Sequence, residues 1–287
     1  MRYTLAALLI AMPLAASAAS LEDTYVAARD GYTKTLTALD KPNPNPTAGP
    51  DEKFLKAQDD ARADLERQLR TIVGPVAVKG FTGAGKINLE SLVEGYEDFG
   101  KLDGLVYSGP DDKTPLLVTT TGLLGRWLKA HGKWWSDNNI PKGVDAALKS
   151  GAFYTQAIGT GAAFTPYVTL PVASATQPTV AMLVGQAQDI GPVAPDELIV
   201  AAVRGGRLYL ISAPAAEKVT RLPACDQLWN AALKKAEKMQ GSDAQERVRE
   251  EGDKAARACF AERAKKETFF SAGIRQAQDF LGRLPSQ

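Results

Sequence analysis

The chain has 287 residues, of which 45% are hydrophobic and 23% are charged, and its formal net charge at pH 7 is +1. That length can bury a substantial core, in one large domain or in two smaller ones. The balanced charge argues against a nucleic-acid partner, because proteins that bind nucleic acid concentrate positive charge to displace counterions from phosphates.

The first residues have the three parts of a secretory signal peptide. Arg2 gives a positive start, residues 3–12 form a short apolar stretch, and residues 16–18 are a small-residue cleavage motif. The apolar stretch is shorter than the roughly 20 residues that cross a bilayer, and no cysteine stands near the cleavage site to carry a lipid. We therefore expect residues 1–18 to be removed and the mature chain to be periplasmic or secreted, with no membrane span.

Two helices are expected at the start of the mature chain. Between residues 20 and 39 apolar side chains recur every three or four residues, which is the spacing of one helix face, and Ser20 is suited to cap that helix. The alternating prolines of residues 41–46 end it. Helical spacing resumes from Asp51 to Val73. The sequence thus predicts an N-terminal helical hairpin over residues 19–73.

Residues 74–223 are expected to form a sheet-containing α+β core. Short apolar runs bounded by glycine and proline predict three strands, at Val76–Val78, Gly104–Tyr107 and Leu116–Thr119. Thr121 is expected to cap a helix that runs through Leu123, Trp127 and His131. The clearest hairpin joins residues 197–203 to residues 208–213 through Gly205 and Gly206, which readily take positive φ. We predict a mixed or antiparallel sheet of at least four strands.

Residues 224–287 return to helical spacing and contain both cysteines. Gly241-Ser242 separates two helical segments and stands midway between Cys225 and Cys259. Equal arms around a turn bring the cysteines together in an antiparallel helical hairpin, so we expect a disulfide. The second helix should continue past Phe269, with a bend at residues 271–273. In this α+β fold the two terminal hairpins would flank the central sheet, and residues 19–287 could form one domain.

A short segment with two adjacent indoles is the strongest candidate for contact with a partner. It contains His131, Trp134, Trp135 and Asp137. Adjacent indoles on a polar loop can stack on sugar rings or anchor a protein interface. The alternative is structural: one indole packs into the core, the other covers the helix end, and His131 terminates the helix.

A second candidate lies in a stretch from Ser150 to Gln188 that has neither a charged residue nor a histidine. Four of its aromatic residues would line an apolar cleft for a ligand or partner, namely Phe153, Tyr154, Phe164 and Tyr167. The alternative is buried sheet and loops packed beneath helices.

Motifs for catalysis, metals and nucleotides are weak in this chain. Residues 80–86 have the spacing of a phosphate-binding loop, but Ile87 follows where the motif requires Ser or Thr. A glycine-rich turn explains the same residues. His131 is the single histidine, and G-x-S-x-G is missing from the sequence. We therefore predict no catalytic residue, no cofactor and no metal site.

These observations favour an exported, non-enzymatic binding protein, of an inhibitor or immunity type, whose partner is a protein or another envelope macromolecule such as the cell wall. One alternative is an envelope hydrolase that uses two carboxylates on a glycan or peptide, because such carboxylates need only be neighbours in space. The other is a protein that captures a small apolar ligand.

Overall fold

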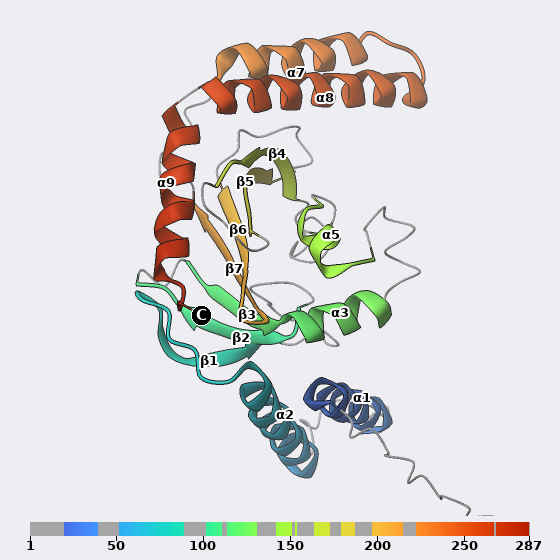
Figure 1. The fold of residues 1–287 in the computed structure, drawn as a ribbon. Helices are drawn as coiled ribbons and strands as arrows, with labels where there is room; N and C mark the ends of the chain where they lie inside the picture. Colours follow the sequence, from blue (N-terminus) through green and yellow to red (C-terminus); the bar gives the residue numbers. More distant parts are fainter. Residues whose placement is uncertain are drawn as a thin grey trace, which may run out of the picture.

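The computed structural model describes residues 20–39, 52–88, 102–110, 114–130, 142–150, 153, 164–172, 179–186, 197–214, 222–266 and 268–286. Within these ranges the protein is α+β, with helices arranged around one seven-stranded sheet (Figure 1). Every strand pair is antiparallel. The predicted α+β class is confirmed, and the sheet is antiparallel rather than mixed.

The helices and strands alternate irregularly along the chain. The helices are α1 (Leu21–Leu39), α2 (Glu52–Val73), α3 (Thr121–Ala130), α5 (Val144–Leu148), α7 (Pro223–Ala236), α8 (Ser242–Lys266) and α9 (Thr268–Arg283). The strands are β1 (Thr82–Asn88), β2 (Gly104–Ser108), β3 (Leu116–Thr120), β4 (Phe164–Leu170), β5 (Thr179–Gln186), β6 (Glu197–Arg204) and β7 (Arg207–Pro214).

The strand order β1-β2-β3-β7-β6-β5-β4 combines two meanders. Strands β1 to β3 follow one another, as do β4 to β7, and the pairing of β3 with β7 joins the two groups. The β6–β7 turn has positive φ at both Gly205 and Gly206, which matches the twist of the strands it connects. The predicted hairpin is confirmed, and β1 and β4 are the two edges of the sheet.

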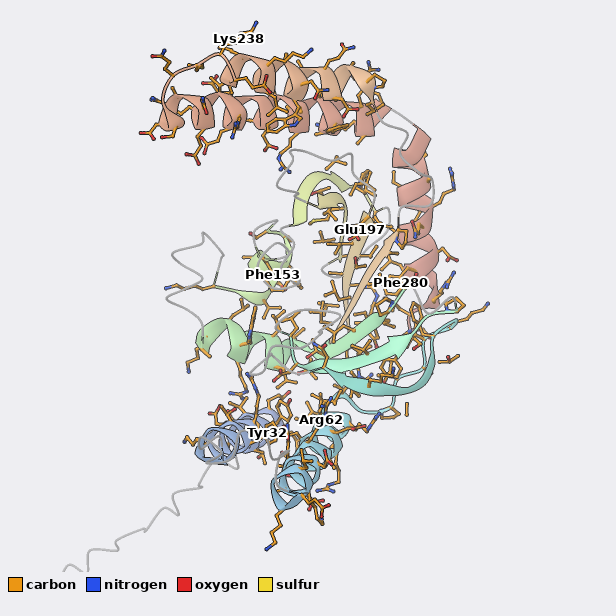
Figure 2. All side chains as sticks on the ribbon, turned by 180° about the vertical axis from the view of Figure 1, so that it is seen from behind. Tyr32, Arg62, Phe153, Glu197, Lys238 and Phe280 are labelled. Carbon is orange, nitrogen blue, oxygen red and sulfur yellow. A yellow bond between two sulfur atoms is a disulfide. The ribbon has the colours of Figure 1, made fainter. Side chains whose placement is uncertain are left out.

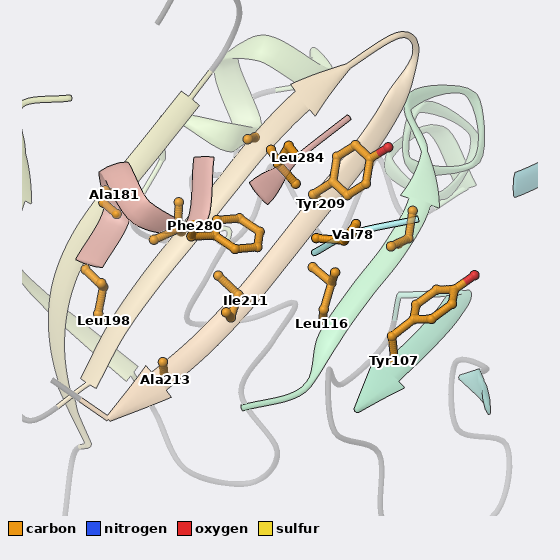
Figure 3. Packing of buried hydrophobic residues seen from close by; sticks show 14 of the residues in the cluster. Val78, Tyr107, Leu116, Ala181, Leu198, Tyr209, Ile211, Ala213, Phe280 and Leu284 are labelled. Atoms are coloured by element: carbon orange, nitrogen blue, oxygen red, sulfur yellow. The ribbon is translucent and has the colours of Figure 1, made fainter. Parts of the chain in front are cut away.

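Both faces of the sheet are covered, which explains why the central strands are apolar throughout. Alternate side chains of β3 point to opposite faces, so Leu116 and Val118 belong to one hydrophobic core and Leu117 belongs to the other. The first core includes residues of α2 and α9, and Figure 3 shows Phe280 of α9, and Leu284 just after this helix, near strand residues such as Tyr209. The second core includes residues of α3 and α5.

The predicted strand at residues 76–78 is wrong, and β1 is a strand where the sequence predicts a turn. Residues 76–78 are not part of a strand, although Val78 is buried. The strand is β1, in the segment interpreted above as a glycine-rich turn. Its pairing with β2 contains a register shift, and Gly83 and Gly85 have positive φ. A Cβ at Gly85 would lie 3.0 Å from Cζ of Tyr107, so this strand needs glycine where it passes the tyrosine.

The helix caps agree with the sequence in one case and differ in another. The backbone N–H of Asp23 donates to Oγ of Ser20 over 3.2 Å, so Ser20 caps α1 as predicted. At α3, the N–H of Leu123 donates to Oγ1 of Thr120 over 3.0 Å, so the cap is Thr120 and not Thr121. The hydroxyl of Thr121 instead donates to the carbonyl oxygen of Gly206.

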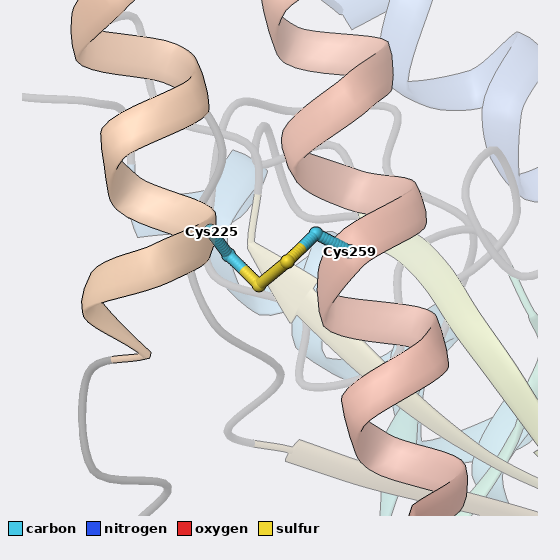
Figure 4. Close-up of a disulfide and its surroundings, with 2 residues drawn as sticks. All are labelled: Cys225 and Cys259. Atoms are coloured by element: carbon cyan, nitrogen blue, oxygen red, sulfur yellow. A yellow bond between two sulfur atoms is a disulfide. The ribbon is translucent and has the colours of Figure 1, made fainter.

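The predicted disulfide is confirmed. Cys225 of α7 and Cys259 of α8 are bonded, with their Cα atoms 5.4 Å apart (Figure 4). The turn between the two helices contains Gly241 at a φ of 97°. Disulfides persist in oxidising compartments, so this bond is compatible with an extracellular location.

The path after α8 differs from the prediction. Residues 271–273 lie inside α9 rather than at a bend, and the chain leaves α8 after Lys266. A Cβ at Gly273 would lie 2.9 Å from Cδ1 of Leu170, so this glycine lets α9 approach the sheet closely. None of the helices in the described ranges is long and apolar enough to cross a membrane.

Candidate functional site

The predicted partner-binding residues lie outside the described residues. These are His131, Trp134, Trp135 and Asp137, and they follow α3, which ends at Ala130. Because α3 packs into the second core through Trp127 and its leucines, the segment starts from a firmly anchored helix. Its role in binding a partner stays a prediction.

Of the four residues predicted to line an apolar cleft, Phe153 can be placed in detail. It is fully buried and packs edge-on against Trp127, with ring centroids 6.3 Å apart. Phe153 therefore belongs to the core beneath α3 and α5. Phe164 and Tyr167 fall in the first four residues of edge strand β4, and Tyr154 lies outside the described residues.

Buried polar groups are few in the described part of the chain. Asn88, Thr119 and Thr120 are the buried polar residues there. Asn88 donates from Nδ2 to the carbonyl oxygen of Leu102 over 2.7 Å, and Thr120 caps α3. In the same ranges, no three His, Cys, Asp or Glu residues come together as a metal site would require.

A polar network attaches α1 to the start of β2. The hydroxyl of Tyr25 donates to Oδ2 of Asp103 over 3.3 Å, and Nη1 of Arg29 lies 3.0 Å from the same oxygen. The Asp103 side chain is only 8% exposed, so the ion pair is largely shielded from water. The sequence alone does not predict this network, because Asp103 lies 74 positions after Arg29 and 78 after Tyr25.

The pKa shifts in the described residues move ionisation away from neutral pH. Burial, reinforced by the charge of Asp103, raises the pKa of Tyr25 far above its usual value. Burial also raises the pKa of Tyr107. The hydroxyl of Ser20 lowers the pKa of the exposed Asp23, and Asp60 raises the pKa of Lys56. Each of these four groups keeps its ordinary charge at pH 7, as expected for structural groups.

The most distinctive accessible feature is the α7–α8 arm, which we define as residues 223–266. Helix α8 contacts β4, and α7 packs on α8 away from the sheet (Figure 1). Neither of the two cores on the sheet contains a residue of α7. The arm has a small core of its own around Cys225 and Phe260.

Two features make this arm rigid. The disulfide joins its helices near the end where the arm meets the rest of the molecule. Farther along, Gly252 is buried where the helices touch, and a Cβ there would lie only 2.2 Å from Cβ of Ala232. Such close backbone contact requires glycine. The arm is thus fixed in shape by its own residues.

The outer surface of the arm combines charges with one large apolar side chain. Leu228 of α7 is 43% exposed. Exposed charged residues occur along both helices, such as Lys234 and Lys235 of α7 and Glu250 of α8, and Lys238 stands near the distal turn (Figure 2).

Comparisons with known proteins add no family to this description. No protein-family model, no curated protein and no solved structure matches the chain.

Proposed function

We propose that this protein is exported and acts by binding another envelope macromolecule, in the manner of an inhibitor, immunity-type or accessory protein. The observation that carries the proposal is the α7–α8 arm. Its outer helix adds nothing to the two cores of the sheet, yet a disulfide and a glycine contact hold it rigid. Rigid, pre-organised surfaces bind partners at a lower entropic cost.

Export is the second part of the proposal. The signal-like residues 1–18 support it, and so does the disulfide, because cytosolic reductants keep most thiols reduced. We further infer that the two terminal helical hairpins flank the sheet at its opposite edges. The packing of α1 on α2 near β2, and of α7 and α8 near β4, supports this arrangement.

The segment with Trp134 and Trp135 is proposed as a second contact with the same partner. Its support comes from composition, since adjacent indoles are enriched at interface hot spots. The two contacts can be separated by mutation, because Leu228 lies on the arm and the indoles follow α3.

A capture experiment tests the proposal. The mature chain is immobilised, incubated with envelope extract, and the retained proteins and glycans are identified and quantified. We expect one partner in stoichiometric amount, which Leu228→Asp or the double change Trp134→Ala/Trp135→Ala reduces by about tenfold. Leu55→Asp is the matched control, because Leu55 is 41% exposed on α2, away from the arm.

Two results would contradict the proposal. One is retention of nothing above an empty matrix. The other is turnover of peptidoglycan by the purified chain without a stoichiometric partner, which would establish the hydrolase alternative.

A further inference from the structure

A groove follows the outer edge of β1, where α2 packs beside the sheet. Its volume is about 370 Å³, and it is lined by Arg62 and Glu66 of α2, by Gly85, Lys86, Ile87 and Asn88 of β1, and by Val106 of β2. Figure 2 shows Arg62 on α2, at the end of the molecule where β1 lies. We call this the β1 edge groove.

Arg70 of α2 occupies two of the hydrogen-bond acceptors at this groove. Its Nε donates to Oε1 of Glu66 over 2.9 Å, and its Nη2 donates to the carbonyl oxygen of Gly85 over 2.5 Å. The same guanidinium also donates to the carbonyl oxygen of Ala84. Glu66 is the one carboxylate among the described residues that line the groove, and it is paired within α2.

Two cations of the groove remain uncompensated. Arg62 and Lys86 are exposed, and neither has an acidic partner among the residues that the structure describes. With Glu66 paired to Arg70, these two side chains leave the groove with a net positive charge. A guanidinium and an ammonium on facing elements are suited to hold an oxyanion, the first as a fork of donors and the second as a point charge.

The edge of β1 favours a compact anion over an added peptide strand. A further strand would need the free carbonyl groups of β1, and Arg70 already binds those of Ala84 and Gly85. The register shift and the positive φ of Gly83 and Gly85 also break the regular spacing that strand pairing requires.

We propose that the β1 edge groove binds a phosphate-type oxyanion through Arg62 and Lys86. This site is distinct from the proposed partner-binding surface and does not depend on it. It is also no phosphate-binding loop of the nucleotide-binding kind, because Lys86 lies inside a strand rather than at the start of a helix. The anion would be held by side-chain charge.

The test titrates inorganic diphosphate into the mature chain at low ionic strength by calorimetry. We expect saturable 1:1 binding that weakens as sodium chloride is added. The double variant Arg62→Gln/Lys86→Gln should bind at least about tenfold more weakly, because both charged donors to the anion are lost. Both side chains are exposed, so the variant should retain the circular dichroism and melting temperature of the wild type.

A matched control and a second probe make the result decisive. Arg249→Gln/Lys254→Gln removes the same charge from exposed positions of α8 and should bind diphosphate like the wild type. Vesicles of phosphatidylcholine with phosphatidylglycerol distinguish a lipid headgroup from a free phosphate compound. Loss of either binding in the groove variant alone supports the site. Equal binding by both double variants, or no binding of either probe to the wild type, overturns it.

Discussion

At the scale of single residues, the contact of α1 with the sheet depends on a buried phenol and a shielded ion pair. Tyr25 is fully buried, and its hydroxyl donates to Asp103, which also accepts from Arg29. Removing one member of a buried pair leaves the other desolvated and uncompensated, which is more costly than the loss of a single hydrogen bond. Among residues 21–34 of α1, Tyr25 is the fully buried core residue and Val26, Ala28 and Tyr32 pack against the core, so these polar contacts add to a partly buried apolar face.

This network predicts a dependence of stability on alkaline pH. The folded-state pKa of Tyr25 lies above its ordinary value of 10.0, so the phenol is neutral in both states at pH 7. As the pH rises past 10.0, the unfolded state ionises first, and the free energy of unfolding falls. Urea unfolding between about pH 9 and pH 11 should show a shallower fall for Tyr25→Phe than for the wild type.

Tyr25→Phe should also be less stable than the wild type at neutral pH. Loss of the hydrogen bond to Asp103 should lower the free energy of unfolding at pH 7 by about 1–2 kcal/mol. Burial also raises the pKa of Tyr107, but this residue is present in both proteins. Its contribution to the pH dependence is therefore the same in the wild type and the variant. Parallel pH profiles for wild type and variant would show that Tyr25 ionises freely in the folded state.

At the scale of secondary structure elements, α7 and α8 are held together by a contact that excludes a side chain. Gly252 is buried against Ala232, whereas most helix pairs are separated by interdigitating side chains. The disulfide supports the same pairing through a covalent bond that spans 34 positions of the chain. The arm consequently has a defined shape with little help from the cores on the sheet.

Two glycine-to-alanine variants test this packing against helix propensity. Gly252→Ala should lower the free energy of unfolding by about 1–3 kcal/mol, because its methyl group would overlap Ala232 and force the helices apart. Gly31→Ala, in α1 with open space around it, should raise that free energy by about 0.5–1 kcal/mol through helix propensity alone. Chemical denaturation measures both. Stabilisation by both variants would mean that α7 and α8 do not pack as closely as described.

At the scale of the whole molecule, the pairing of β3 with β7 joins two meanders into one sheet. Residues of all seven strands except β1 enter the buried cores, and β2, β3, β5, β6 and β7 contribute to both. Opening these strands would expose both cores at once, whereas the edge strands β1 and β4 can separate at a lower cost.

Hydrogen exchange should reveal this gradient. We expect the amides of β3, β6 and β7 to exchange most slowly, and those of β1 to exchange fastest among the strands, by at least about a hundredfold. Exchange read by mass spectrometry on peptides from each strand gives the order. Equal protection of β1 and β7 would indicate that the sheet opens as a single unit.

The sequence by itself determined the features that depend on neighbouring residues. Helical spacing and Ser20 located α1, the Gly-Gly pair located the β6–β7 turn, and the symmetric placement of Cys225 and Cys259 located the disulfide. Periodicity, capping and turn chemistry are local, so they can be interpreted in a single chain.

Tertiary structure alone decided the strand order, the edge position of β1 and the convergence of distant charges. The glycines of β1 are typical of a turn, so the sequence predicts one there. The segment is a strand because it packs against Tyr107 and accepts hydrogen bonds from Arg70, both distant in the chain. Asp103 forms an ion pair with Arg29, and Lys86 lines the same groove as Arg62, across long stretches of sequence. Such contacts depend on how whole elements pack to bury apolar surface. The spacing of residues along the sequence predicts local structure and does not predict that packing.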